Sequence, residues 1–247
     1  MPPLKHRMSA RTHLKIYESR RHLAVTLFTL IIPFIALLVF SRYAHIAAPV
    51  LFKNVFVSVG RLAVAYVIAA ALGWLLAVLF YRGKRSAVAL PLFDVLQSFP
   101  TFAALPIAAL YWGPSNFTVI FFLVLAVIWP ILFSVTSSLK LIRRDAEDAV
   151  QILGLSGWEY VKKFLWPVAV PGLITGSVIG LGDGWEALIA TEIIVNVRSG
   201  LGNFFQASAQ NLSITAFGIL AFLIVIFSIN KLIWLPLLDR SHEIMEE

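Results

Sequence analysis

Long apolar segments recur along this chain, and they constrain its fold more than any other feature of the sequence. A helix that crosses a membrane needs about 20 mostly apolar residues. The 247-residue chain contains several such segments, separated by short charged loops. Hydrophobic residues make up 60% of the chain, charged residues make up 13%, and the mean hydropathy is +0.87, a balance that is rare in soluble domains. The sequence therefore predicts an all-α, polytopic membrane protein.

Six membrane-spanning helices are expected. Their approximate bounds are 23–40, 62–81, 88–112, 117–139, 168–195 and 214–238. The third segment contains Pro91, Pro100 and Pro106, which predict a short helix, a kink near Pro100 and then the span, because proline interrupts the helical hydrogen-bond ladder. The first 22 residues are basic and lack the pattern of a cleaved secretory signal, so the first span is expected to stay attached.

The same pattern divides the chain into segments. We expect a basic N-terminal tail at 1–22, a first span with an outer loop at 23–54, a transmembrane domain at 55–238 and a C-terminal tail at 239–247.

Basic residues mark the cytoplasmic side of a membrane protein, because short loops rich in Lys and Arg are retained there. Fourteen basic residues fall on the side of the N-terminal tail, the turn after the second span and the loop after the fourth, whereas the opposite loops hold only Arg42, Lys53 and Arg198. We therefore expect both termini in the cytoplasm of a multi-pass protein. The net charge of +7 is interpreted as topology and contact with anionic lipid rather than nucleic-acid binding.

The sequence lacks the residues and motifs that several classes of enzyme and metal site require. No cysteine is present, the five histidines lie outside the expected spans, and neither H-E-x-x-H nor G-x-S-x-G occurs. A phosphate-binding G-x-x-x-x-G-K-[ST] loop is also absent, so this chain alone is not expected to hydrolyse ATP. We predict no catalytic residue, no metal ligand and no cofactor on this chain.

A polar helical hairpin, at about residues 140–167, lies between the fourth and fifth spans. Acidic residues open its first helix, Gly154 is the expected left-handed cap, and Ser156 with Glu159 reads as a capping box that opens a second short helix. Pro167 and Pro171 would mark the start of span five. The hairpin could present a compact apolar knob for a groove in a partner, formed by Leu153, Leu155, Trp158, Tyr160 and Phe164.

At this hairpin the chain resembles the permease subunits of bacterial ABC importers, whose cytoplasmic loop reads Glu-Ala-Ala, three residues, Gly, nine residues, Ile, any residue and Leu-Pro. Gly154 and Pro167 match the motif at the family's spacing, whereas Asp stands for Glu and Trp for Leu. The matched positions are Asp148, Ala149, Val150, Gly154, Phe164, Trp166 and Pro167. The resemblance implies that this loop couples the permease to an ATPase, with Leu155, Ser156 and Trp158 in the same loop.

Two further segments resemble the nitrate, sulfonate, taurine and bicarbonate branch of that family. The first is QSFPTFAALPIAALYWG at 97–113, in which Pro100 and Pro106 hold the places of the branch's prolines. The second is GWEALIATE followed by GLG, in which Trp185, Glu192 and Gly200 match. Together the resemblance covers about 56–238.

The resemblance implies a type I importer permease in the bacterial inner membrane. Two copies would form a homodimer with two ATPase subunits below, which bind ATP and magnesium, and a solute-binding protein above. The transported solute would be a small anion or organosulfonate. An ATP-independent carrier or channel is the alternative, although it would leave the hairpin without a role.

Span five combines small and acidic residues. Gly172, Gly176, Gly180 and Gly184 recur every four residues, which favours close helix packing over a path-lining or sliding role. Glu186 and Glu192 are candidates, with Asp183, for bonding partner helices, capping the glycine-rich break, pairing with Arg61 or Arg198, or lining the path. For Arg61 itself, extension to the membrane interface is favoured over contact with an anion. Other candidates for the path are Phe99, Thr101, Phe102, Trp112, Trp185 and Asn203.

Overall fold

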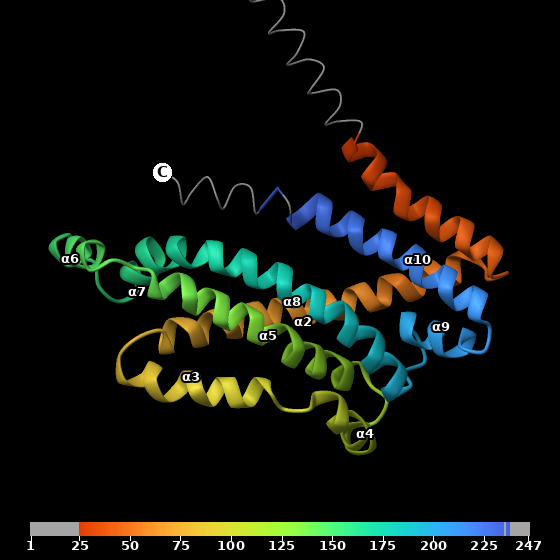
Figure 1. Ribbon diagram of the computed structural model, residues 1–247, viewed down its shortest axis with the longest axis horizontal. Helices are drawn as coiled ribbons and strands as arrows, with labels where there is room; N and C mark the ends of the chain where they lie inside the picture. The colour runs from red at the N-terminus through yellow and green to blue at the C-terminus, as the bar shows by residue number, and fades with distance from the viewer. Residues whose placement is uncertain (1–24, 235, 238–247) are drawn as a thin grey trace, which may run out of the picture.

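The computed structural model describes residues 25–234, 236 and 237, and all regular structure among these residues is helical (Figure 1). The predicted tails at 1–22 and 239–247 lie outside the described residues, as do positions 23 and 238 at the predicted ends of the outermost spans.

The helices follow one another through short connections. In chain order they are a first helix Val25–Tyr43, α2 Ala48–Phe80, α3 Gly83–Gln97, α4 Thr101–Trp112, α5 Asn116–Lys140, α6 Arg144–Ile152, α7 Gly157–Tyr160, the π-helical turn η1 Val161–Leu165, α8 Trp166–Val195, α9 Leu201–Ser208, α10 Leu212–Ile229 and the π-helical turn η2 Asn230–Trp234.

Five helices in the described part of the chain are long and apolar enough to cross a membrane. A sixth span results if the bent pair α3 and α4 is counted as one. The prediction of an all-α polytopic protein with about six spans is therefore confirmed. The kink expected near Pro100 is confirmed as well: α3 and α4 meet at 76°, and Pro100 caps the start of α4.

One sequence-based boundary is wrong and one short helix was not predicted. The second span starts at Ala48 rather than near residue 62, because Pro49 sits in the first helical turn, where its missing N–H costs nothing, and the helix continues through Lys53 and Arg61. The sequence also does not predict the short helix α9, which lies between the fifth and sixth spans.

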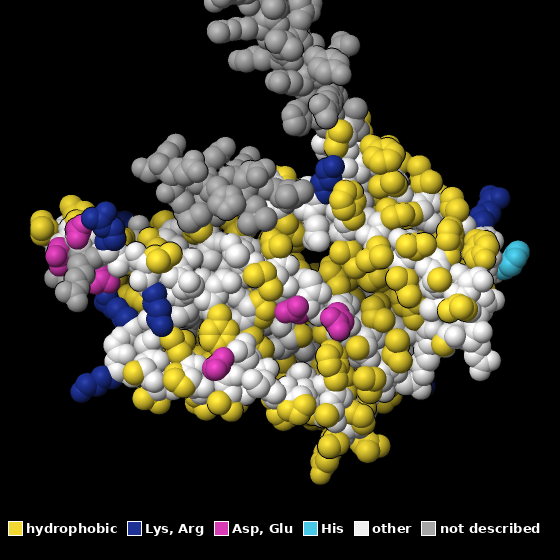
Figure 2. All heavy atoms as spheres, in the orientation of Figure 1, with side chains coloured by type: hydrophobic (Ala, Val, Ile, Leu, Met, Phe, Trp, Pro, Cys, Tyr) yellow, Lys and Arg dark blue, Asp and Glu magenta, His cyan; other side chains and the backbone are white. Residues whose placement is uncertain are grey.

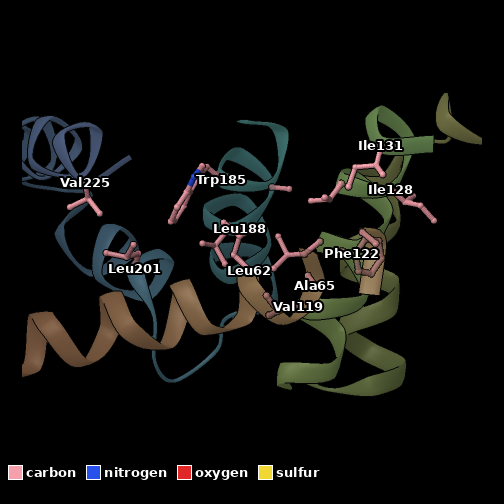
Figure 3. Close-up of a cluster of buried hydrophobic side chains, with 14 of the residues drawn as sticks. Leu62, Ala65, Val119, Phe122, Ile128, Ile131, Trp185, Leu188, Leu201 and Val225 are labelled. Carbon is pink, nitrogen blue, oxygen red and sulfur yellow. The ribbon is translucent and has the colours of Figure 1, made fainter. Parts of the chain in front are cut away.

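The centre of the bundle is a layer of three long helices, α2, α5 and α8, in which α5 packs against both of the others (Figure 1). Figure 3 shows apolar side chains from these helices meeting in one cluster, including Leu62 and Ala65 from α2, Val119 and Ile131 from α5, and Leu188 from α8. The hairpin lies at one end of this layer, and α4 and α9 lie at the other (Figure 1).

The glycines of α8 bring its backbone against α5. A Cβ atom at Gly176 would lie 2.6 Å from the Cα atom of Ile131, and one at Gly172 would lie 2.5 Å from the carbonyl oxygen of Ser134. At Gly180 and Gly184 the nearest atoms would be 2.9 Å away. Close approach of this kind is how small residues promote helix association in a bilayer, where lipid tails are as apolar as the helix surfaces. These contacts favour the packing interpretation of the glycine repeat.

Replacing Gly176 with alanine is expected to destabilise the bundle by about 2 kcal/mol, because the new methyl group would meet backbone atoms that cannot turn aside. Gly182→Ala on the same helix is the matched control, since a Cβ atom there meets nothing within 4 Å. Thermal unfolding in detergent, followed by tryptophan fluorescence, measures both variants. Equal midpoints would contradict the packing account.

Candidate functional site

The hairpin turns at Gly154, as the sequence predicts. The helix α6 ends at Ile152, the N–H of Leu155 donates to the carbonyl of Val150 at 3.2 Å, and Gly154 adopts a φ of +68°. A side chain at this φ is strained, which favours glycine. A second left-handed residue, Gly157 at +56°, follows three positions later and was not predicted.

The predicted capping box is wrong. Ser156 does precede α7, but its side chain accepts no capping hydrogen bond. Glu159 pairs instead with Lys163 one turn further along, at 2.7 Å on the surface. Of the two residues that match the motif, Ser156 thus makes no capping hydrogen bond and Glu159 takes another partner.

The second helix of the hairpin does not end before span five. Residues Gly157–Val195 form one continuous helix, in which the π-helical turn η1 directly precedes α8 and its Pro167. A proline cannot donate to the hydrogen-bond ladder, and a π-helical turn shifts that ladder without breaking the helix. Pro167 lies in the first turn of α8, as expected for the start of span five, but α8 is not a separate helix: α7 and η1 of the hairpin continue directly into it.

Three apolar side chains form the exposed hairpin tip: Ile152, Leu153 and Trp158, which are 86%, 73% and 72% exposed. The predicted knob included two of them. Tyr160 and Phe164, also placed in the knob, are half-buried with their rings 5.4 Å apart, and Leu155 is half-buried too. The sequence did not single out Ile152, because it reads as an ordinary core position of α6.

The other predicted coupling residues lie around this tip. Asp148 and Ala149 are exposed on α6, Ser156 is exposed at the turn, and Pro167 is exposed in the first turn of α8. The ring of Trp166 lies 5.5 Å from that of Trp74 on α2, so this position binds the start of α8 to the bundle.

Two side-chain contacts connect the hairpin to the end of α2. Arg82 forms an ion pair with Glu147 of α6, and the hydroxyl groups of Tyr81 and Tyr160 lie 3.4 Å apart. Burial and the bond to Tyr160 raise the pKa of Tyr81, so its phenol keeps its proton. The hairpin is thus attached to two core helices: through the backbone to α8 and through side chains to α2.

A polar network lies at the opposite end of the bundle. It is formed by the buried side chains of Ser58, Arg61 and Glu192 together with the exposed Asn116. Arg61 Nη1 lies 2.5 Å from Glu192 Oε1, with the two side chains 6% and 0% exposed. The expectation that Arg61 extends to the interface is therefore wrong. An ionised group inside an apolar bundle needs a partner, and here the chain itself supplies it.

The remaining bonds of the network fix the connection between α8 and α9. Ser58 Oγ donates to Glu192, the N–H of Gly202 donates to Glu192 Oε2 at 2.8 Å, and the N–H of Leu201 donates to Ser58 Oγ at 2.8 Å. Arg61 also donates to Asn116 Oδ1 and to the carbonyl of Ser199. A Cβ atom at Gly200 or Gly202 would overlap the Glu192 side chain. Of the roles left open for Glu192, the structure shows pairing with Arg61 and capping of the start of α9.

A cavity of about 550 Å³ opens between the α3 and α4 break, α5 and α8. Among the predicted path residues, Glu186, Phe99, Thr101 and Phe102 line it. The sequence did not identify Trp129, Phe133, Ser134 and Thr191, which also line it, because wall and core positions look alike on an apolar helix.

Other predicted path residues lie elsewhere. Trp185 is buried within the apolar cluster (Figure 3), with its ring 5.3 Å from that of Phe222. Asn203 donates to the carbonyl of Val197. Trp112 packs against Phe117 and Phe121, and Pro106 is exposed within α4.

Glu192→Gln is expected to destabilise the protein by about 3 kcal/mol, because it leaves the buried guanidinium of Arg61 without its counter-charge. Glu159→Gln is the control: it removes the same charge from an exposed pair, which contributes little. Thermal unfolding in detergent compares the two. A Glu192→Gln protein as stable as the control would argue against the pair as a structural constraint.

Comparison with known proteins places this chain in a family. Residues 69–241 match the model of the binding-protein-dependent transport system inner membrane component. Similar proteins include the nitrate import permease protein NrtB of Synechocystis sp., at 34% identity over 70% of this chain and 62% of the relative. The bicarbonate transport system permease protein CmpB of Synechococcus elongatus is 31% identical over 65% of this chain and 59% of the relative. The taurine transport system permease protein TauC of Escherichia coli is 30% identical over 54% of this chain and 51% of the relative.

The chain spans about three-fifths of the length of the first two of these relatives. The family match covers well over half of the chain and confirms the resemblance to ABC importer permeases of the nitrate, taurine and bicarbonate branch. The protein belongs to the family of binding-protein-dependent transport system inner membrane components.

Proposed function

We propose that the chain is the permease subunit of an ATP-driven importer, which forms the path for a small solute of the nitrate, sulfonate, taurine or bicarbonate type. The family supports transport that depends on a binding protein, and the names of the relatives support this range of solutes. The observation that carries the ATP-driven part is the hairpin tip: an exposed apolar surface next to a helix that continues without a break into the core helix α8.

In this proposal the hairpin tip docks in a groove of an ATPase subunit. Apolar side chains at the centre of an interface contribute most of its binding energy, and an exposed tryptophan beside two aliphatic residues suits that role. Movement of the tip would pass along the continuous helix into α8, and through Arg82 and Tyr81 into α2. Both helices belong to the central layer, so the displacement would switch the bundle between a state open to the cytoplasm and a state open to the opposite side of the membrane.

The proposed transporter contains other subunits, which are placed as follows. ATP and magnesium would bind to the separate ATPase, since no phosphate-binding loop occurs in this sequence. The hairpin end would face the cytoplasm of a bacterial cell, because the basic loops lie on that side. The solute-binding protein would meet the opposite end, and a second copy of the chain would complete a homodimer.

Replacing Leu153 and Trp158 together with serine is expected to reduce the amount of ATPase that co-purifies with the chain by about tenfold, because the apolar contact is lost. Quantitative mass spectrometry of the complex purified from its native membrane in mild detergent gives the ratio of the two subunits.

Leu212→Ser is the control for this experiment, since Leu212 is also exposed but begins α10 at the far end of the bundle. Equal loss in both variants would point to general destabilisation. If the wild-type chain carries no ATPase, an ATP-independent carrier or channel becomes the better explanation.

A further inference from the structure

Two carboxylates without partners line the cavity between the α3 and α4 break, α5 and α8. Asp183 and Glu186 lie about one turn apart on α8, and none of the ion pairs found among the described residues includes either of them. Figure 2 shows acidic side chains near the middle of one face, among hydrophobic and other uncharged groups. Asp183 and Glu186 differ from Glu192 on the same helix, whose charge is matched by Arg61 and by hydrogen bonds.

The cavity contains no compensating charge of its own. Among the residues that the structure describes, its lining includes no Lys or Arg side chain, and its other polar members are neutral: Gln97, Thr101, Ser134 and Thr191. Ionised groups in the middle of a membrane-spanning helix are costly and are normally paired. Two unpaired carboxylates on one wall therefore favour a positive group as the occupant and disfavour a simple inorganic anion.

A buried hydroxyl group provides a second, independent observation. Thr191 is fully buried and lines the same cavity, yet its Oγ1 atom has no hydrogen-bond partner among the described residues. Buried polar atoms are normally satisfied, and leaving one without a partner costs free energy. A polar ligand in the cavity would satisfy this hydroxyl group, and a ligand with N–H donors would satisfy the carboxylates as well.

Aromatic side chains complete the lining. Trp129 and Phe133 come from α5, and Phe99 and Phe102 come from the two sides of the break between α3 and α4. The faces of aromatic rings attract cations, most strongly where water is excluded. Carboxylates on one wall and aromatic rings on the others form a site suited to an ammonium group on a compact organic body.

We propose that this cavity binds the protonated amine of the transported solute, so that the substrate is an amine-bearing molecule rather than nitrate or bicarbonate. The inference rests on the proposed transport function and narrows its substrate class. Asp183 and Glu186 pair with the ammonium group, Thr191 accepts one of its N–H bonds, and the aromatic side chains enclose the carbon skeleton. Among the solutes named for the relatives, taurine carries such a group.

Matched pairs of small probes test this inference without knowledge of the natural solute. Taurine and isethionate differ only in an ammonium group against a hydroxyl group, and so do ethanolamine and ethylene glycol. Saturation-transfer NMR with the purified complex in lipid nanodiscs detects weak binding of each probe. Both amines are expected to bind about tenfold more tightly than their hydroxyl counterparts, as expected for a charged hydrogen bond.

The carboxylates are tested by the double variant Asp183→Asn with Glu186→Gln, which should abolish the preference for the amines. Asp94→Asn is the matched control, because Asp94 is an exposed carboxylate on α3 that does not line the cavity, and this variant should keep the preference. The comparison of probes on the wild-type complex stands even if the double variant does not fold.

Amines that bind no better than their hydroxyl counterparts would overturn the inference, and so would a preference that survives in the double variant. The same preparation also reports on the proposed function, through the ATPase that co-purifies with the wild-type chain. A complex that contains the ATPase but shows no amine preference would contradict the substrate class and leave the transport assignment intact.

Discussion

The close contact between the backbones of α8 and α5 is the constraint on which the rest of the structure depends. In a bilayer no hydrophobic effect drives helices together, so association requires surfaces that fit, and the glycines of α8 provide one. Because α8 is fixed against α5, it can carry the hairpin at one end, Glu192 at the other, and Asp183 and Glu186 between them. One helix thus connects the hairpin tip, which is proposed to bind an ATPase, with the cavity that is proposed to bind the solute.

The acidic residues of α8 show that chemically similar carboxylates take different roles when their surroundings differ. Glu192 is enclosed by Arg61, Ser58 and the N–H groups that open α9, so its charge serves the fold. Asp183 and Glu186 lie a few turns away with no such partners, beside aromatic rings and an unbonded threonine. The buried charge of Glu192 is compensated and is therefore structural, whereas the exposed, uncompensated charges of Asp183 and Glu186 in a cavity are candidates for binding.

The sequence predicts the features that depend on local chemistry. The spans follow from the length of apolar segments, the break follows from Pro100, and the turn follows from Gly154. Features that depend on distant partners were predicted only as alternatives or not at all. Pairing with Arg61, 131 positions away, was one of several roles left open for Glu192, whereas the general behaviour of arginine near a membrane wrongly favoured the interface for Arg61. Likewise, Ser156 and Glu159 match a capping box, yet Glu159 takes Lys163 as its partner.

The central claim is that the hairpin tip binds an ATPase, and a cross-link from the tip itself tests it most directly. A photoreactive benzoylphenylalanine at position 158 would replace an exposed aromatic residue with one of similar shape. Irradiation of native membranes, followed by mass spectrometry of the cross-linked product, identifies the neighbour. The account predicts a polypeptide that contains a phosphate-binding loop for ATP. Cross-links to lipid alone, or to a protein without such a loop, would contradict it.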